Sequence, residues 1–111
     1  MSELRFVYIT TESEAEALDL GRRIVDARLA ACVNVLPAIK SVYRWKNKIE
    51  EGAEAALIVK TRADCLPALT AKVREWHSYE TPCIVALPLA PDEGNPDYLE
   101  WIGNESAAHV D

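Results

Sequence analysis

The sequence has few cysteines and no long apolar run, and both shortages limit what the protein can be. Its three cysteines, Cys32, Cys65 and Cys83, form no close pair, so reduced cytoplasmic thiols are expected rather than a disulfide framework. No stretch approaches the roughly 20 apolar residues that a membrane-spanning helix needs. The first residues include Glu3 and Arg5 and lead into a strand-like segment, which is not the pattern of a signal peptide. We therefore expect a soluble cytoplasmic protein.

Positive charge is also scarce. The chain has 12 lysines and arginines against 18 aspartates and glutamates, which gives a formal net charge of −6. Nucleic-acid phosphates and anionic membranes are bound by clustered lysine and arginine, so neither is expected as a partner. The apolar half of the composition supports one domain over residues 1–111. A chain of this length buries only slightly more than roughly 60% of its unfolded surface, so oligomerisation is a natural source of further stability.

The apolar patterns predict the order strand, helix, strand, strand, helix, strand and terminal helix. Ser13 and Glu16 form a capping box for the first helix, and Asp64 is the expected cap of the second. Asn95 before Pro96 marks the start of the third. The four predicted strands are 4–10, 32–36 resuming at 39–45, 49–61 and 82–89, and the predicted helices are 14–28, 65–76 and 96 through at least 102. The expected apolar stripe of the first helix is Leu18, Gly21, Ile24 or Val25, and Leu29.

The second and third strands are expected to form a long hairpin. Pro37 must interrupt the hydrogen-bond ladder because it has no amide donor. The turn lies at 46–48, where Asn47 can adopt a positive φ. Each arm exceeds the usual five or six residues, so the tip must project from a small domain and is expected to contact another chain.

Split βαβ units with right-handed crossovers predict an α+β, ferredoxin-like βαββαβ sandwich with a C-terminal helix. Its helices cover one face of an antiparallel sheet. The other face would be bare unless further subunits cover it.

Five phrases, taken in order, resemble the CutA family. They are Ala30-Ala31-Cys32-Val33-Asn34, Ser41-x-Tyr43-x-Trp45, Glu54 ahead of Leu57-x-x-Lys60-Thr61, His77-x-Tyr79-Glu80-x-Pro82, and Tyr98-Leu99-x-Trp101-Ile102. The resemblance implies a ferredoxin-like fold and a very stable homotrimer similar to PII signalling proteins. It also implies that the bare sheet face and the hairpin are trimer contacts. The family is associated with tolerance of divalent cations, copper above all, and some members bind copper.

The metal ligands that this resemblance implies are only partly present. Ligands proposed in bacterial relatives include a cysteine ending the first strand and two adjacent histidines. The corresponding positions here look like Thr10, Trp76 and His77, so only His77 is kept.

His77, Glu80 and Cys83 are the candidate metal ligands. They lie close together in the sequence, and thiolate and imidazole suit Cu⁺ whereas imidazole and carboxylate suit Cu²⁺. Their spacing matches no closed metal motif. The alternative is that His77 is a hydrogen-bonded cleft histidine and Cys83 a small core side chain.

A second group of residues is expected to form a cleft or subunit interface. A lysine beside a threonine at a strand end can bind an anion, and a nearby histidine and glutamate can exchange protons. The alternative is a polar network between subunits, in which Lys60 pairs with Glu54 or Glu80. The group comprises Tyr43, Trp45, Glu54, Lys60, His77, Tyr79 and Glu80, with Trp101 as a further core or interface residue.

We expect no enzyme activity. A catalytic Cys–His pair needs a thiol of lowered pKa next to His77, and Cys83 begins an apolar strand, where burial raises a thiol pKa. The sequence therefore predicts a cytoplasmic homotrimer that contributes to divalent-metal tolerance, with weak copper binding. The alternatives are a PII-like sensor of an anionic metabolite and a trimeric scaffold for another protein. His109 is expected to be solvated.

Overall fold

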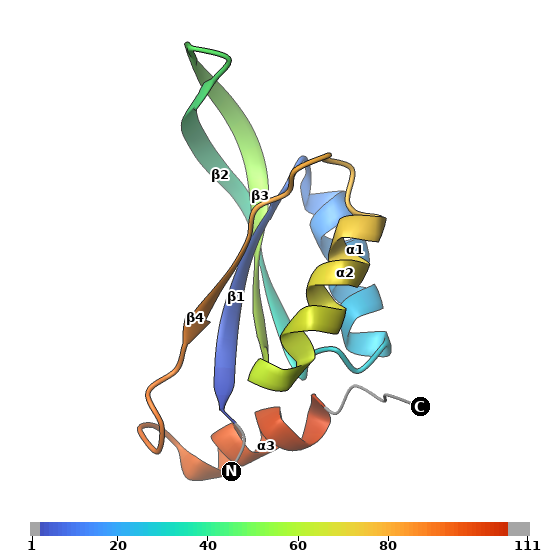
Figure 1. Ribbon diagram of the computed structural model, residues 1–111, viewed down its shortest axis with the longest axis vertical. Helices are drawn as coiled ribbons and strands as arrows, with labels where there is room; N and C mark the ends of the chain where they lie inside the picture. The colour runs from blue at the N-terminus through green and yellow to red at the C-terminus, as the bar shows by residue number, and fades with distance from the viewer. Residues whose placement is uncertain (1–2, 107–111) are drawn as a thin grey trace.

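The computed structural model describes residues 3–106, and these form a four-stranded antiparallel sheet with the order β2-β3-β1-β4. The predicted ferredoxin-like α+β fold is confirmed (Figure 1). His109 lies outside the described residues. The elements are β1 (Leu4–Thr11), α1 (Glu14–Asp26), β2 (Cys32–Trp45), β3 (Lys48–Arg62), the short 3₁₀ helix η1 (Ala63–Cys65), α2 (Leu66–Trp76), β4 (Ile84–Pro88) and α3 (Pro96–Glu105).

The core lies between the sheet and the pair α1 and α2, which cover one face (Figure 1). Alternate residues of β1 and β3 point into it because successive side chains of a strand face opposite sides. The helices contribute residues three or four apart, as a buried helix face requires. The largest fully buried side chains of this core are Val7, Ile9, Ile24, Leu57, Val59, Leu69 and Val73.

The predicted stripe of α1 is partly wrong. Leu18 and Val25 are 38% and 41% exposed, whereas Ala17 and Leu20 are buried. The buried residues of the helix are Ala17, Leu20, Gly21 and Ile24, so Gly21 lies on the side that approaches the sheet. A Cβ at Gly21 would lie 3.2 Å from Cγ1 of Val33. The helix also ends at Asp26, earlier than predicted.

The predicted cap of α2 is wrong as well. Asp64 lies within η1, and its carboxylate accepts a 3.0 Å hydrogen bond from Nε of Arg62. The N-cap position of α2 is Cys65, which makes no side-chain capping bond. The 3₁₀ turn thus moves the N-cap position from Asp64 to Cys65, and the carboxylate of Asp64 is bonded to Arg62.

The hairpin of β2 and β3 extends past the rest of the sheet (Figure 1) and contributes to a longest dimension of 45 Å. Its two-residue turn has φ of 49° at Lys46 and 66° at Asn47, which suits the twist of long paired strands. Pro37 interrupts the ladder as predicted, and it lies on an edge strand, where a missing amide donor is tolerated.

A β-bulge at 37–38 reverses which residues of β2 face each side of the sheet. Leu36 pairs with Ala56 and Ile39 with Glu54, so β2 advances three residues while β3 advances two. Odd-numbered residues beyond the bulge therefore share a face with even-numbered residues before it.

The sheet face opposite α1 and α2 is apolar and largely uncovered. Val85 and Leu87 of β4 are each 52% exposed, and they pair with the half-buried Tyr8 and Phe6 of β1. The strand β4 is shorter than the predicted 82–89 because its ladder with β1 begins at Ile84. We call this surface the open face.

Candidate functional site

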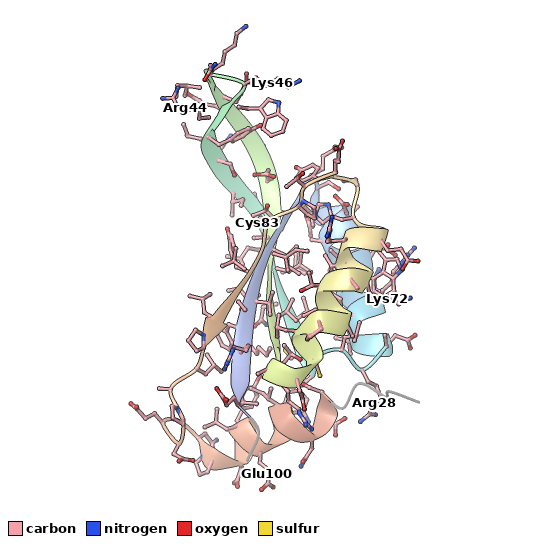
Figure 2. All side chains as sticks on the ribbon, viewed as in Figure 1. Arg28, Arg44, Lys46, Lys72, Cys83 and Glu100 are labelled. Atoms are coloured by element: carbon pink, nitrogen blue, oxygen red, sulfur yellow. The ribbon has the colours of Figure 1, made fainter. Side chains whose placement is uncertain are left out.

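A cleft of about 890 Å³ lies at the base of the hairpin. It is bounded by the hairpin, the end of β1 and the connection from α2 to β4. Figure 2 shows Cys83 at this base and Lys46 at the hairpin tip. The lining residues are Thr10, Ser41, Tyr43, Trp45, Lys46, Glu54, Tyr79, Glu80, Thr81 and Cys83. We call it the hairpin cleft.

The hairpin supplies one wall of this cleft through alternate residues of β2. Ser41, Tyr43 and Trp45 are two apart and therefore lie on one face of the strand. The bulge at 37–38 puts this face on the same side of the sheet as Glu54. The side chain of Tyr43 packs near Gly52, which has no side chain of its own. A Cβ at position 52 would lie 3.9 Å from the Tyr43 hydroxyl.

His77 fixes the opposite wall. Its Nδ1 accepts a 3.0 Å hydrogen bond from the backbone N–H of Tyr79, so the ring proton is on Nε2, which donates to the carbonyl of Thr10 at 2.7 Å. The side chain is fully buried. Both ring nitrogens are thus occupied by backbone groups, and neither is free for a metal. The expectation that His77 is a ligand is corrected to its alternative, a hydrogen-bonded positioning residue.

Glu16 ties the same segment to the start of α1. Its carboxylate accepts from the backbone N–H of Ser78 at 2.8 Å, from the Ser78 hydroxyl at 3.0 Å and from the N–H of Glu12 at 3.0 Å. Burial raises the pKa of this carboxyl, but these hydrogen bonds outweigh burial, and the net pKa is lowered. Half of the predicted capping box is formed: Ser13 Oγ accepts from the N–H of Glu16, whereas the Glu16 carboxylate accepts from the N–H of Glu12 rather than from that of the cap residue Ser13.

Tyr79 connects the two walls. Its hydroxyl donates a 2.8 Å hydrogen bond to Glu54, and its ring centroid lies 4.9 Å from that of His77. Burial, the Glu54 bond and the nearby carboxylates raise the pKa of the Tyr79 hydroxyl strongly, so it remains a donor at physiological pH.

Cys83 is the one soft donor in the cleft lining. It is half-buried, and its thiol lies 3.9 Å from the carbonyl of Tyr8. Burial raises the thiol pKa, and the charge of Glu54 raises it further. Within residues 3–106 no three His, Cys, Asp or Glu side chains lie close enough to hold one metal ion. His77, Glu80 and Cys83 therefore do not form a three-ligand cluster inside one chain.

Lys60 lies away from the cleft, contrary to expectation. Its ammonium donates a 3.1 Å hydrogen bond to the Tyr98 hydroxyl and lies 6.0 Å from the Phe6 ring centroid. Lys60 is six positions after Glu54 on β3, and six positions of an extended strand span about 20 Å. Within one chain it therefore pairs with neither Glu54 nor Glu80, and the predicted anion-binding group is divided between two ends of the sheet; pairing between subunits stays a prediction.

Trp101 also lies outside the cleft. It is on α3, exposed, with its ring centroid 5.4 Å from that of Tyr98. The other two cysteines are placed apart from the site as well: Cys65 is buried and donates to the carbonyl of Ser106, and Cys32 is half-buried on β2.

Sequence reasoning did not assign Lys46 or Thr81 to the site, and it treated Glu16 only as a cap. The sequence indicates that Lys46 is a turn residue next to Trp45, and this position could have suggested that Lys46 belongs to the site. The contact between Glu16 and Ser78 spans 62 positions and has no local sequence signal.

A family model described as "CutA1 divalent ion tolerance protein" matches residues 5–105. The chain is 45% identical over 101 residues to the Protein CutA homolog of Xenopus laevis, covering 91% of this chain and 66% of that protein. It is 45% identical over 96 residues to the divalent-cation tolerance protein CutA of Thermus thermophilus, covering 86% of this chain and 91% of that protein. The chain spans about half the length of the mouse and human relatives that it matches.

Solved structures agree with the sequence matches. The crystal structure of CutA1 from Oryza sativa has a TM-score of 0.92 at 40% identity, with 97% of each chain covered. The Cut A1 structure from Thermus thermophilus has a TM-score of 0.90 at 41% identity, covering 94% of this chain and 99% of that one. Among these relatives, the CutA 1 protein of Oryza sativa is named as chloroplastic, and the CutA protein of Archaeoglobus fulgidus is named as periplasmic. In residues 3–106 no helix is long and apolar enough to cross a membrane.

Proposed function

This chain belongs to the CutA1 divalent ion tolerance family, and on that premise we propose that it acts in divalent-cation tolerance as a homotrimer with weak copper binding and no catalysis. The observation that carries the metal part is the donor set of the hairpin cleft. Cys83, Glu54 and Glu80 line one cavity and offer one soft sulfur and two carboxylates, although within residues 3–106 the three are not close enough to hold one ion together. Thiolate suits Cu⁺ and carboxylate suits Cu²⁺.

Weak binding follows from the incomplete ligand set. A thiol must lose its proton to ligate, and the raised pKa of Cys83 opposes that loss, so affinity is expected to rise with pH. Solvent or a second copy of the chain would supply the remaining ligands. His77 supports this arrangement by holding the segment that carries Glu80.

Titration of Cu⁺ and Cu²⁺ into the protein and into Cys83→Ala tests this site. We expect the substitution to weaken Cu⁺ binding by on the order of tenfold. The control Cys32→Ala removes a half-buried thiol outside the cleft and should leave affinity unchanged. Equal binding by wild type and Cys83→Ala would contradict the proposed site.

The open face supports the homotrimer. Monomeric proteins rarely leave a contiguous apolar surface of this kind uncovered, and Val85 and Leu87 lie exposed on the edge strand β4. Light scattering is expected to give three times the chain mass, and Leu87→Asp is expected to reduce it. The control Ala71→Glu, on the exposed side of α2, should leave the mass unchanged. A monomeric wild type would contradict this part of the proposal.

The contacts of His77 support the absence of catalysis. Its nitrogens bind backbone groups, so it cannot take a proton from Cys83 without giving up a bond that holds the cleft wall. Three free thiols support a cytoplasmic location, which cell fractionation of the native protein would test.

A further inference from the structure

Three aromatic rings line the hairpin cleft. Tyr43 and Trp45 come from β2, and Tyr79 comes from the α2–β4 connection on the other side. Tyr79 is held at both ends, by Glu54 at its hydroxyl and by His77 against its ring. Because the Tyr79 side chain is already held in place, little conformational entropy is lost when a ligand binds against it.

The charge of the cleft lining is negative. Glu54 and Glu80 carry two negative charges, and Lys46 carries one positive charge. The Cys83 thiol is neutral at pH 7 because burial raises its pKa. Since Lys60 lies at the other end of the sheet, no further lysine or arginine within residues 3–106 lines the cavity.

One of the three rings, that of Trp45, already has a cation near it, the ammonium group of Lys46. The ammonium of Lys46 lies 6.0 Å from the ring centroid of Trp45, at the outer limit of a cation–π contact. This contact is weak and exposed, because both residues are at the hairpin tip. Lys46 therefore behaves as an internal ligand that a better-placed cation can displace.

We propose that the hairpin cleft binds a small organic cation of the alkylammonium class between Tyr43, Trp45 and Tyr79, with Glu54 and Glu80 neutralising its charge. Aromatic rings attract weakly hydrated ammonium groups through their negative faces, and carboxylates add long-range attraction. The cavity of about 890 Å³ is within the usual size range of small-molecule sites. The proposal goes beyond metal tolerance and does not require a bound metal.

Tetramethylammonium is the probe, titrated at constant ionic strength and followed by NMR of the indole N–H signals. We expect saturable millimolar binding that shifts the Trp45 signal, with about fivefold weaker binding in Trp45→Leu. The matched control Trp101→Leu removes another exposed tryptophan, on α3, and should bind as wild type does. The neutral analogue tert-butanol should not saturate the site.

Two charge variants sharpen the test. Glu54→Gln keeps an acceptor for Tyr79 but removes the charge, and it should weaken binding, whereas Glu100→Gln on α3 should not. Lys46→Gln removes the internal competitor and should strengthen binding.

Three results would overturn the proposal. The first is that tert-butanol binds as tightly as tetramethylammonium, and the second is that Trp45→Leu and Trp101→Leu weaken tetramethylammonium binding equally. The third is that tetramethylammonium binding does not saturate. Cys83→Ala should keep tetramethylammonium binding, so a failed copper site and a failed ammonium site give different results.

Discussion

The hydroxyl of Tyr79 donates a 2.8 Å hydrogen bond to the carboxylate of Glu54, joining two segments that are 25 residues apart. One segment is the connection after α2, and the other is the base of the hairpin. The bond therefore fixes the width of the hairpin cleft, on which both proposed ligands depend.

Tyr79→Phe removes this bond and keeps the ring. We expect it to lower the free energy of unfolding by about 1–2 kcal/mol, because the acceptor is charged and partly buried. Urea denaturation measures the change. The control Tyr43→Phe, on the opposite wall, should change it by less than about 0.5 kcal/mol. An equal effect of the two substitutions would mean that the bond contributes no net stability.

Glu16 should make stability depend on pH below neutrality. Burial acts to raise its pKa, but the bonds from Ser78 and Glu12 prevail, so the folded pKa lies below the reference value of 4.5. A lowered folded pKa stabilises the protein fully above the unfolded pKa, and this contribution is lost as pH falls through the folded pKa. Glu16→Gln should therefore flatten the stability curve between pH 5 and acid conditions.

Denaturation of Glu16→Gln at a series of pH values measures that slope. Glu14→Gln is the control, since Glu14 is exposed in the same first turn of α1. A wild-type slope in Glu16→Gln would show that other groups cause the acid sensitivity.

The two helical glycines should respond oppositely to substitution. A Cβ at Gly103 of α3 meets nothing within 4 Å, so Gly103→Ala should stabilise by about 0.5–1 kcal/mol through helix propensity. Gly21 faces Val33 at 3.2 Å, so Gly21→Val should destabilise by about 1–3 kcal/mol through overpacking. Thermal unfolding measures both, and the same sign for both would contradict the close approach of α1 to β2.

The Cys83 thiol should react slowly at neutral pH. Burial raises its pKa above the reference value of 9.0, and only the thiolate reacts with iodoacetamide. The midpoint of its alkylation rate against pH, followed by peptide mass spectrometry, should lie above that of a free cysteine peptide. Rapid labelling of Cys83 at pH 7 would instead indicate an activated thiol and reopen the possibility of nucleophilic chemistry.

The order of elements could be predicted from sequence because it depends on local patterns. Ser13 with Glu16, Asn95 with Pro96, and Pro37 on an edge strand each act within a few residues. Asp64 failed as a cap because Arg62, two residues away, competes for its carboxylate. Local signals are reliable only where no neighbour offers a stronger partner.

The membership of the site was harder to predict because it depends on strand length and side-chain direction. Lys60 and Glu54 are near in sequence but far apart along an extended strand, so one belongs to the cleft and the other does not. The ring of His77 faces backbone groups rather than solvent, which spacing alone cannot show. Tyr43, Trp45 and Tyr79 were grouped by their family phrases, and the structure places them together.

The single extra residue of β2 at 37–38 behaves like a frameshift in side-chain orientation. Without it, unbroken alternation from Leu36 would place Val42 and Arg44, rather than Tyr43 and Trp45, on the side of Glu54. Deletion of Ala38 would remove the extra residue but keep Ile39 opposite Glu54, so Trp45 should stay on the cavity side. Quenching of Trp45 fluorescence by iodide should therefore be the same in this deletion variant as in the wild type.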